Sequence, residues 1–333
     1  MHSVSFWRPG ITAVGLFGLI VLGVGLCLST GAFDTSWVGA LLHLWQDDGS
    51  NAAFSVRELR LPRVLCALGV GASMALSGAL IQVITRNPLG DPGLTGVSGG
   101  AAFGVALCLT LISAAPSAIV TSGIAGGMFA ATLTFTIAGT SAARPMQLVL
   151  AGVSVSVFFI AATSAVMILA KSSMQTLYFW MIGGFTNRDW AEFKLFWPWA
   201  LGAALAAFLL SPILGYLRFG DEQAATMGLN AARWRVTAGL IAVVLAAVSV
   251  AVAGPIGFVG FLAPHLARLS LGSAAQISWL WLLLSALGGA AIVVWADTFA
   301  RLYFEGRAPA GVTITILGGF AFLILVRTMR PTA

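Results

Sequence analysis

The chain has 333 residues, of which 59% are hydrophobic and only 8% are charged. A soluble domain carries about 25% charged residues, so this composition excludes a soluble globular protein. The net charge of +6 does not indicate a nucleic-acid partner, because the chain has only two lysines and its arginines are scattered between apolar runs. We expect a single integral membrane domain over residues 1–333.

Apolar runs follow one another along nearly the whole chain, and a membrane-spanning helix needs about 20 such residues. The pattern predicts an all-α, polytopic membrane protein with about ten transmembrane helices. The predicted spans are 11–29, 62–84, 94–113, 117–139, 146–170, 190–211, 234–253, 256–272, 279–301 and 312–328. No clear A-x-A cleavage site follows the first run, so we interpret it as a span rather than a signal peptide.

The charged residues between the spans bear on the orientation. An even number of spans places both termini on one side of the bilayer. Arginines occur on both faces and barely decide between them, whereas most acids fall on the face opposite the termini. We therefore expect both termini to be cytoplasmic, in the cell inner membrane. The acids assigned to the outer face are Asp34, Asp47, Asp48, Glu58, Asp189, Glu192, Asp297 and Glu305.

Small residues recur every four positions on three of the predicted spans. Such spacing lets helix backbones approach closely where lipid provides no hydrophobic drive, so it predicts a compact bundle. The positions are Ala67, Gly71, Ala75 and Ala79, then Gly96, Gly100 and Gly104, then Gly123, Gly127 and Ala131. The three cysteines lie in apolar runs without metal-ligand spacing, so we expect neither a metal site nor a cofactor.

The first polar stretch within the apolar chain reads Arg60-Leu-Pro-Arg63 before a span and continues after it over residues 86–98. Pro88 and Pro92, in the part after the span, indicate a short turn, in which Asn87 and Asp91 can satisfy free backbone groups. A rigid turn alone does not explain the polar residues that crowd there. Asn87 and Pro88 are therefore pathway or structural candidates.

Residues 216–235 form a long polar loop on the predicted cytoplasmic face. Asp221 and Glu222 favour a helix N-terminus, and Gly228 favours a C-terminal stop. A short helix here would suit a docking surface for a soluble partner, while an ordinary connector is the alternative.

The stretch 254–269 contains Pro264, His265 and Arg268 within an apolar run. A histidine inside a membrane is a functional candidate, and Arg268 lies close to it in sequence. The alternative is structural, since Pro264 frees a backbone carbonyl that His265 could satisfy.

Four stretches in this order resemble the permease subunits of type II ABC importers, the FecCD-like family for iron-siderophores, haem and cobalamin. The resemblance covers essentially the whole chain. The stretches are RLPR with RNPLGDPGLTGVSGGA, YFWMIGGF with DW, the Gly220-x3-Ala224-x3-Gly228 loop, and GPIGFVGFLAPHLAR. The resemblance implies a BtuC-like permease fold. It also implies that two subunits enclose a central path, either as a homodimer or as one copy of this chain with a sister permease.

The resemblance also implies roles and partners. A dimeric ABC ATPase would dock on the coupling loop, whose matching residues are Gly220, Asp221, Glu222, Ala224 and Gly228. A separate substrate-binding protein would present acids to Arg60, Arg63 and Arg301, for which membrane-interface snorkelling is the alternative. The cytoplasmic gate would include Thr140 and Ser141, and a short outer helix over residues 171–183, with Trp180, would lie near the pathway mouth.

The chain departs from the family's pattern near its end. Arg307-Ala308-Pro309 stands where the family has an acid before Leu-Pro, and Phe320 replaces the proline that usually follows Gly318-Gly319. These differences concern the last outer loop.

Two other functions compete with the permease. A secondary transporter would use buried acids for ion coupling, and Asp297 is the only acid near a span's interior. An intramembrane hydrolase would need Ser73 or Ser77 as nucleophile and His265 as base. The sequence contains no G-x4-G-K-[ST] motif, so we assign ATP hydrolysis to a partner and expect no enzyme in this chain. The expected cargo is an iron-siderophore, with haem and cobalamin as alternatives.

Overall fold

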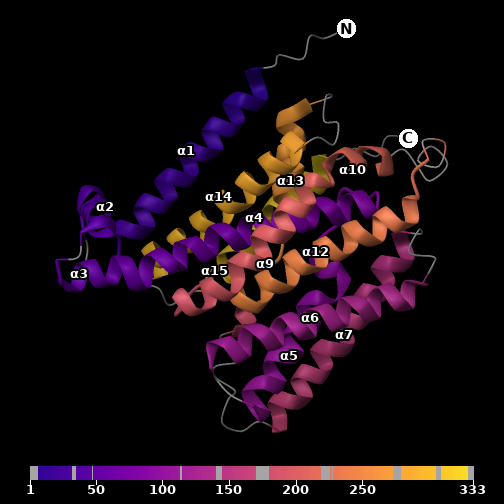
Figure 1. The fold of residues 1–333 in the computed structure, drawn as a ribbon, viewed down its shortest axis with the longest axis horizontal. Coiled ribbons are helices and arrows are strands. Elements are labelled where there is room, and N and C mark those ends of the chain that lie inside the picture. Colours follow the sequence, from indigo (N-terminus) through magenta and orange to yellow (C-terminus); the bar gives the residue numbers. More distant parts are fainter. Residues whose placement is uncertain are drawn as a thin grey trace.

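A computed structural model describes residues 7–31, 35–46, 48–112, 115–139, 145–169, 180–218, 226, 228–272, 279–304 and 309–328. This part of the chain is an all-helical bundle (Figure 1), and each of the ten predicted spans largely coincides with one helix of 13 to 26 residues. The ten are α1 (Trp7–Ser29), α4 (Leu61–Ile84), α5 (Val97–Leu111), α6 (Pro116–Ala138), α7 (Pro145–Leu169), α9 (Trp190–Leu209), α12 (Ala231–Ala253), α13 (Val259–Leu271), α14 (Trp279–Phe304) and α15 (Ala310–Thr328).

Short helices connect or extend these ten. They are α2 (Trp37–Trp45), α3 (Asn51–Phe54), the π-helix η1 (Ser55–Arg60), the 3₁₀-helix η2 (Pro92–Thr95) and α10 (Ser211–Arg218). The predicted span 190–211 ends at Leu209, where the chain bends by 58° into α10. Asp189 and Glu192 form a capping box that fixes the start of α9.

Six of the described helices are long and apolar enough to cross a bilayer, or seven if the bent pair of α9 and α10 is one span. Helices α5 and α13 have 15 and 13 residues, about 20 Å each, and are shorter than the hydrocarbon core of about 30 Å. An irregular segment precedes each: η2 with its flanks before α5, and residues 254–258 before α13. Irregular backbone at membrane depth must be enclosed by protein, and both segments lie within the bundle.

Helix α4 is the central helix of the bundle and is mostly buried, as are α12 and α14, whereas α1 and α7 are mostly exposed. It contacts α14, α12, α13 and α9. A Cβ added at Gly71 would collide with the carbonyl of Gly289 on α14, and one at Gly78 would collide with the carbonyl of Gly260 on α13. Only glycine permits these two crossings.

Helices α5, α6 and α7 form a second group packed against α12 (Figure 1). Added Cβ atoms at Gly100 and Gly104 would collide with backbone atoms of Gly126 and Ser122 on α6. Gly123 and Gly127 bring α6 against Ala251 and Ala247 of α12. The close packing predicted from the small residues is therefore confirmed.

Candidate functional site

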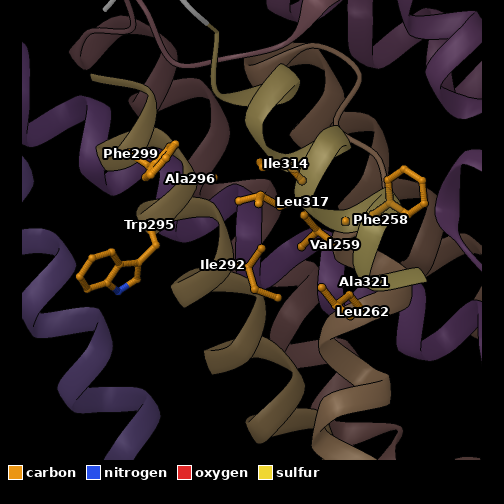
Figure 2. A pocket seen from close by; sticks show the side chains of 11 residues that line it. Phe258, Val259, Leu262, Ile292, Trp295, Ala296, Phe299, Ile314, Leu317 and Ala321 are labelled. Atoms are coloured by element: carbon orange, nitrogen blue, oxygen red, sulfur yellow. The ribbon is translucent and has the colours of Figure 1, made fainter. Parts of the chain in front are cut away.

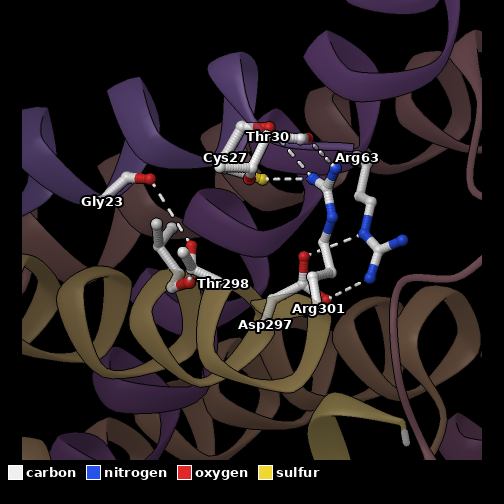
Figure 3. Close-up of polar contacts among 8 residues, drawn as sticks. Gly23, Cys27, Thr30, Arg63, Asp297, Thr298 and Arg301 are labelled. Carbon is white, nitrogen blue, oxygen red and sulfur yellow. Dashed lines mark hydrogen bonds and ion pairs between the residues drawn. The ribbon is translucent and has the colours of Figure 1, made fainter. Parts of the chain in front are cut away.

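Two arginines from other helices, Arg301 and Arg60, cap the C-terminus of α1, and Figure 3 shows the first of them. Arg301 of α14 donates to the carbonyls of Cys27 and Thr30, at 3.0 and 2.5 Å. Arg60 of η1 is buried, with 4% of its surface exposed, and donates to the carbonyl of Leu28 at 2.7 Å. The last carbonyls of a helix have no partner within it and carry partial negative charge. The two guanidiniums satisfy the carbonyls of Cys27 and Leu28 and join α1 to both η1 and α14.

Arg63, at the start of α4, forms a bidentate ion pair with Asp297 of α14. Its Nε lies 2.8 Å from Asp297 Oδ2, and its terminal amino group lies 2.7 Å from Oδ1 (Figure 3). Asp297 is 1% exposed, so the guanidinium of Arg63 is the partner of a buried carboxyl group. Fork-to-fork geometry of this kind is specific as well as strong.

These bonds change the interpretation of the predicted docking arginines. Arg60, Arg63 and Arg301 all have partners inside the subunit, which the sequence did not reveal. Docking of a binding protein at these side chains stays a prediction, and it would compete with the internal bonds. Asp297, the acid proposed for ion coupling, is neutralised by Arg63, which weakens the support for a secondary transporter.

Gln82 lies near the end of α4, away from Arg63, and connects this end of the helix to α13 and to the turn that follows α4. Pro264 has no N–H, so the carbonyl four residues earlier, that of Gly260, lacks its helical donor. Gln82 Nε2 donates to this carbonyl at 3.3 Å and to that of Gly90 at 3.3 Å. The structural alternative for His265, in which it satisfies this freed carbonyl, is therefore not the arrangement observed, because Gln82 is the donor. Gln82 is the only residue with an amide side chain in the apolar run 62–84, and the sequence analysis did not use this signal.

Arg268 and Trp281 complete this cluster. Arg268 donates to Gln82 Oε1, and its guanidinium lies 5.0 Å from the centre of the Trp281 ring. The Trp281 indole donates to the carbonyl of Pro264 at 3.0 Å. His265 stacks on Phe261, and its buried Nδ1 has no hydrogen-bond partner among the described residues.

The connection from α4 to α5 is built by its own polar side chains, as predicted. Asn87 Oδ1 accepts from the N–H of Leu89 at 2.9 Å, and Asp91 Oδ1 accepts from the N–H of Gly93 at 2.8 Å. Pro88 is exposed in the same turn. The other oxygen of Asp91 is buried without a donor, and burial raises the pKa of this carboxyl group to about 6.

The segment that follows the predicted outer short helix joins three helices. Trp180 is buried, and the N–H of Gly184 donates to the carbonyl of Ala253 at 2.7 Å. The N–H of Gly311 donates to the carbonyl of Gly183 at 3.1 Å. The segment thus links the end of α12 to the starts of α9 and α15.

Several predicted residues fall outside the described part of the chain. They are Thr140 and Ser141 of the gate, residues 171–179 of the short outer helix, and Gly220, Asp221, Glu222 and Ala224 of the coupling loop. Gly228 is described: it is exposed, and its φ of +74° suits the predicted stop. Asn230 then caps α12 by accepting from the N–H of Arg233 at 3.0 Å.

Ser77, one of the two serines proposed as a nucleophile, has a structural partner. Ser77 is fully buried and donates to the carbonyl of Ala242 on α12 at 2.6 Å. This bond to backbone uses the hydroxyl proton that a base would have to accept. The geometry therefore gives no support to a hydrolase built on Ser77 and His265.

Two of the cavities in the described bundle are lined mainly by apolar side chains. The first, of about 450 Å³, lies between α13, α14 and α15 (Figure 2) and is lined by residues such as Phe258, Ile292 and Leu317. The second, of about 470 Å³, lies between α1, α13 and α14. Neither lining includes an acidic or basic side chain, so neither can recognise a charged metal chelate. The described residues also contain no cluster of His, Cys, Asp or Glu able to hold a metal ion.

Comparison with known proteins gives end-to-end matches. A sequence model described as the FecCD transport family matches residues 19–328. The Fe(3+)-citrate import system permease protein YfmD of Bacillus subtilis (strain 168) is 38% identical over 94% of this chain and 93% of its own length. The hemin transport system permease protein HmuU of Yersinia pestis is 31% identical over 94% and 93%. A solved inward-facing structure of a metal-chelate type ABC transporter is 29% identical, with a TM-score of 0.84 over 95% of this chain and 99% of that one.

Proposed function

The chain belongs to the FecCD transport family, and we propose from this premise that it carries a ferric chelate across the bacterial inner membrane. It is the permease subunit of an ABC importer, with a BtuC-like fold. The proposal of a ferric chelate as the cargo rests on the match to a ferric-citrate permease over more than nine tenths of both chains. An iron-siderophore or iron-citrate complex is therefore the proposed cargo, with haem as the alternative that the hemin permease supports.

A second permease subunit is part of this proposal. A ferric chelate presents charged or strongly polar oxygens, and burying such groups without partners is costly. The two cavities described above have no charged group in their walls, and only the second adds hydroxyl groups, those of Thr12 and Ser270, to its apolar lining. We place the translocation path between two subunits, either two copies of this chain or one copy with a sister permease, and we propose Thr140 and Ser141 as part of its gate.

An ATPase dimer and a substrate-binding protein complete the proposed importer. With both termini cytoplasmic, the loop around 220–228 faces the cytoplasm and serves as the seat of the ATPase. The end of the bundle at which α1 ends and α4 begins then faces outward, toward the binding protein. The positive φ of Gly228 supports this docking site, because it lets the chain turn sharply from the loop into α12.

The cargo can be tested with the isolated importer. The permease would be co-purified with its ATPase and binding protein, and ATP hydrolysis measured with the binding protein offered ferric citrate, a ferric siderophore, haem or cobalamin. We expect a ferric chelate to stimulate hydrolysis most. Stimulation by cobalamin alone would contradict the proposed cargo while leaving the permease assignment intact.

A further inference from the structure

Helix α2 presents an apolar face that no described residue of the subunit covers. Its exposed residues form one continuous face of about 140° at 3.6 residues per turn. This face consists of Trp37, Val38, Leu41, Leu42 and Trp45, which are 40%, 67%, 55%, 52% and 88% exposed. It contains no polar or charged side chain other than the indole groups at its two ends.

The opposite side of α2 is already packed against protein. Ala40 is buried in a small cluster with Leu28 of α1 and Val56 of η1, and Leu44 packs against it. Apart from His43, whose Nδ1 lies 3.9 Å from Asp48, the side chains of α2 are apolar on both sides, whereas a surface helix usually has one polar face. With nine residues α2 is too short to span a bilayer.

The depth of α2 follows from its contact with α1. A Cβ added at Gly25 would lie 2.8 Å from the Trp37 ring, so this ring covers Gly25. Gly25 precedes the end of α1 at Ser29 by four residues, or about 6 Å. Helix α1 has 23 residues, about 34 Å, and exposes Val14, Phe17 and Leu22 along its length, so its end reaches the membrane interface. Helix α2 thus lies at the depth of interfacial amphipathic helices, about 5–10 Å into the boundary between headgroups and acyl chains.

We propose that α2 is an interfacial anchor, whose exposed face inserts into the lipid boundary at the end of the bundle where α1 ends. Tryptophans at both ends of the face suit this boundary, where their rings are enriched. A binding protein is a less fitting occupant, because it would meet a face without a charge for complementary docking. The anchor holds η1, and with it the Arg60 cap of α1, against the membrane surface.

The test uses bimane attached to Leu41→Cys in vesicles of phosphatidylethanolamine and phosphatidylglycerol. Two quenchers are compared: a phosphatidylcholine carrying a doxyl nitroxide near its carbonyl, and aqueous iodide. Glu58→Cys is the matched control, because Glu58 is exposed at the same end of the bundle. The native cysteines are at most 1% exposed, and the unsubstituted protein checks that they stay unlabelled.

We expect the lipid quencher to reduce emission at Leu41→Cys at least about twofold more than at Glu58→Cys, with iodide giving the reverse order. Trp45→Cys repeats the measurement if Leu41→Cys does not fold. Iodide quenching at position 41 equal to that at position 58 would overturn the proposal. Iodide quenching that disappears only when the binding protein is added would also overturn it, in favour of a protein occupant.

Discussion

Arg63 and Asp297 lie 234 residues apart in the sequence and meet in a two-pronged ion pair that joins the start of α4 to the end of α14. Both residues lie at the end of the bundle where Arg60 and Arg301 cap α1. Four charged side chains thus tie α1, η1, α4 and α14 together at one face. This face is also where the proposed importer receives its cargo, so the same residues determine its shape.

Asp297→Asn should destabilise the subunit strongly. The substitution leaves the guanidinium of Arg63 largely buried without a counter-charge, and breaking a buried pair costs about 3–5 kcal/mol. Thermal unfolding in detergent measures the effect, with Glu58→Gln as an exposed control at the same end that should leave the midpoint unchanged. An Asp297→Asn midpoint equal to that of the unsubstituted protein would show that the pair contributes little.

Gly78→Ala should disturb the crossing of α4 and α13. The added methyl group would collide with the carbonyl of Gly260, and overpacking of this kind costs about 1–3 kcal/mol. Gly202→Ala on α9 is the matched control, because a methyl group there meets nothing within 4 Å. The control should be neutral or slightly stabilising, since alanine favours a helix over glycine. Equal unfolding midpoints for the two variants would contradict this packing.

Gln82→Leu should cost about 1–3 kcal/mol, because it leaves the buried carbonyl of Gly260 without a donor. Pro264→Ala restores an N–H that can donate to this carbonyl within α13. The cost of Gln82→Leu should therefore fall by about 1 kcal/mol in the Pro264→Ala background. The part of the Gln82→Leu cost that remains in this background reflects the lost hydrogen bond from Arg268 to Gln82 Oε1. Strictly additive effects in this double-mutant cycle would refute the proposed role of Gln82.

The stability of the subunit should fall as the pH rises past the pKa of Asp91. Its pKa is about 6 in the folded protein and about 3.9 in an unfolded chain, so the folded state binds more protons between these values. Stability gained at low pH is lost as the pH rises from about 4 through 6, by at most roughly 3 kcal/mol. Unfolding midpoints at pH 5 and pH 8 should therefore differ.

Asp91→Asn provides the control for this pH dependence, because an amide oxygen can still accept from the N–H of Gly93. In the Asp91→Asn variant, the difference in unfolding midpoint between pH 5 and pH 8 should be smaller by the part that Asp91 contributes. An unchanged difference between pH 5 and pH 8 would assign the effect to another group.

The apolar runs predicted the long helices well, since membrane length and hydrophobicity largely determine where such helices occur. Helices α6 and α12 start and end within three residues of their predictions. Helices α5 and α13 are shorter than predicted, because Gly and Pro residues near their starts keep the backbone irregular. Helix α2 was not predicted, because a helix of nine residues beside a loop gives no span signal.

The polar contacts were less accessible to sequence reasoning. Asn87 and Asp91 bond within two residues of themselves, so local turn chemistry was sufficient to predict them. Arg301 bonds to a carbonyl 274 residues away, and Gln82 to one 178 residues away. Such partners depend on how the helices pack, which the pattern of a single sequence does not specify.

The most direct test of the account is uptake into sealed proteoliposomes that contain the permease and its ATPase, with the binding protein and a ⁵⁵Fe-labelled chelate outside. We predict uptake that requires ATP inside the vesicles and stops when the partner ATPase carries an inactivating substitution. Uptake driven by a proton or sodium gradient without ATP would contradict the account and establish a secondary transporter.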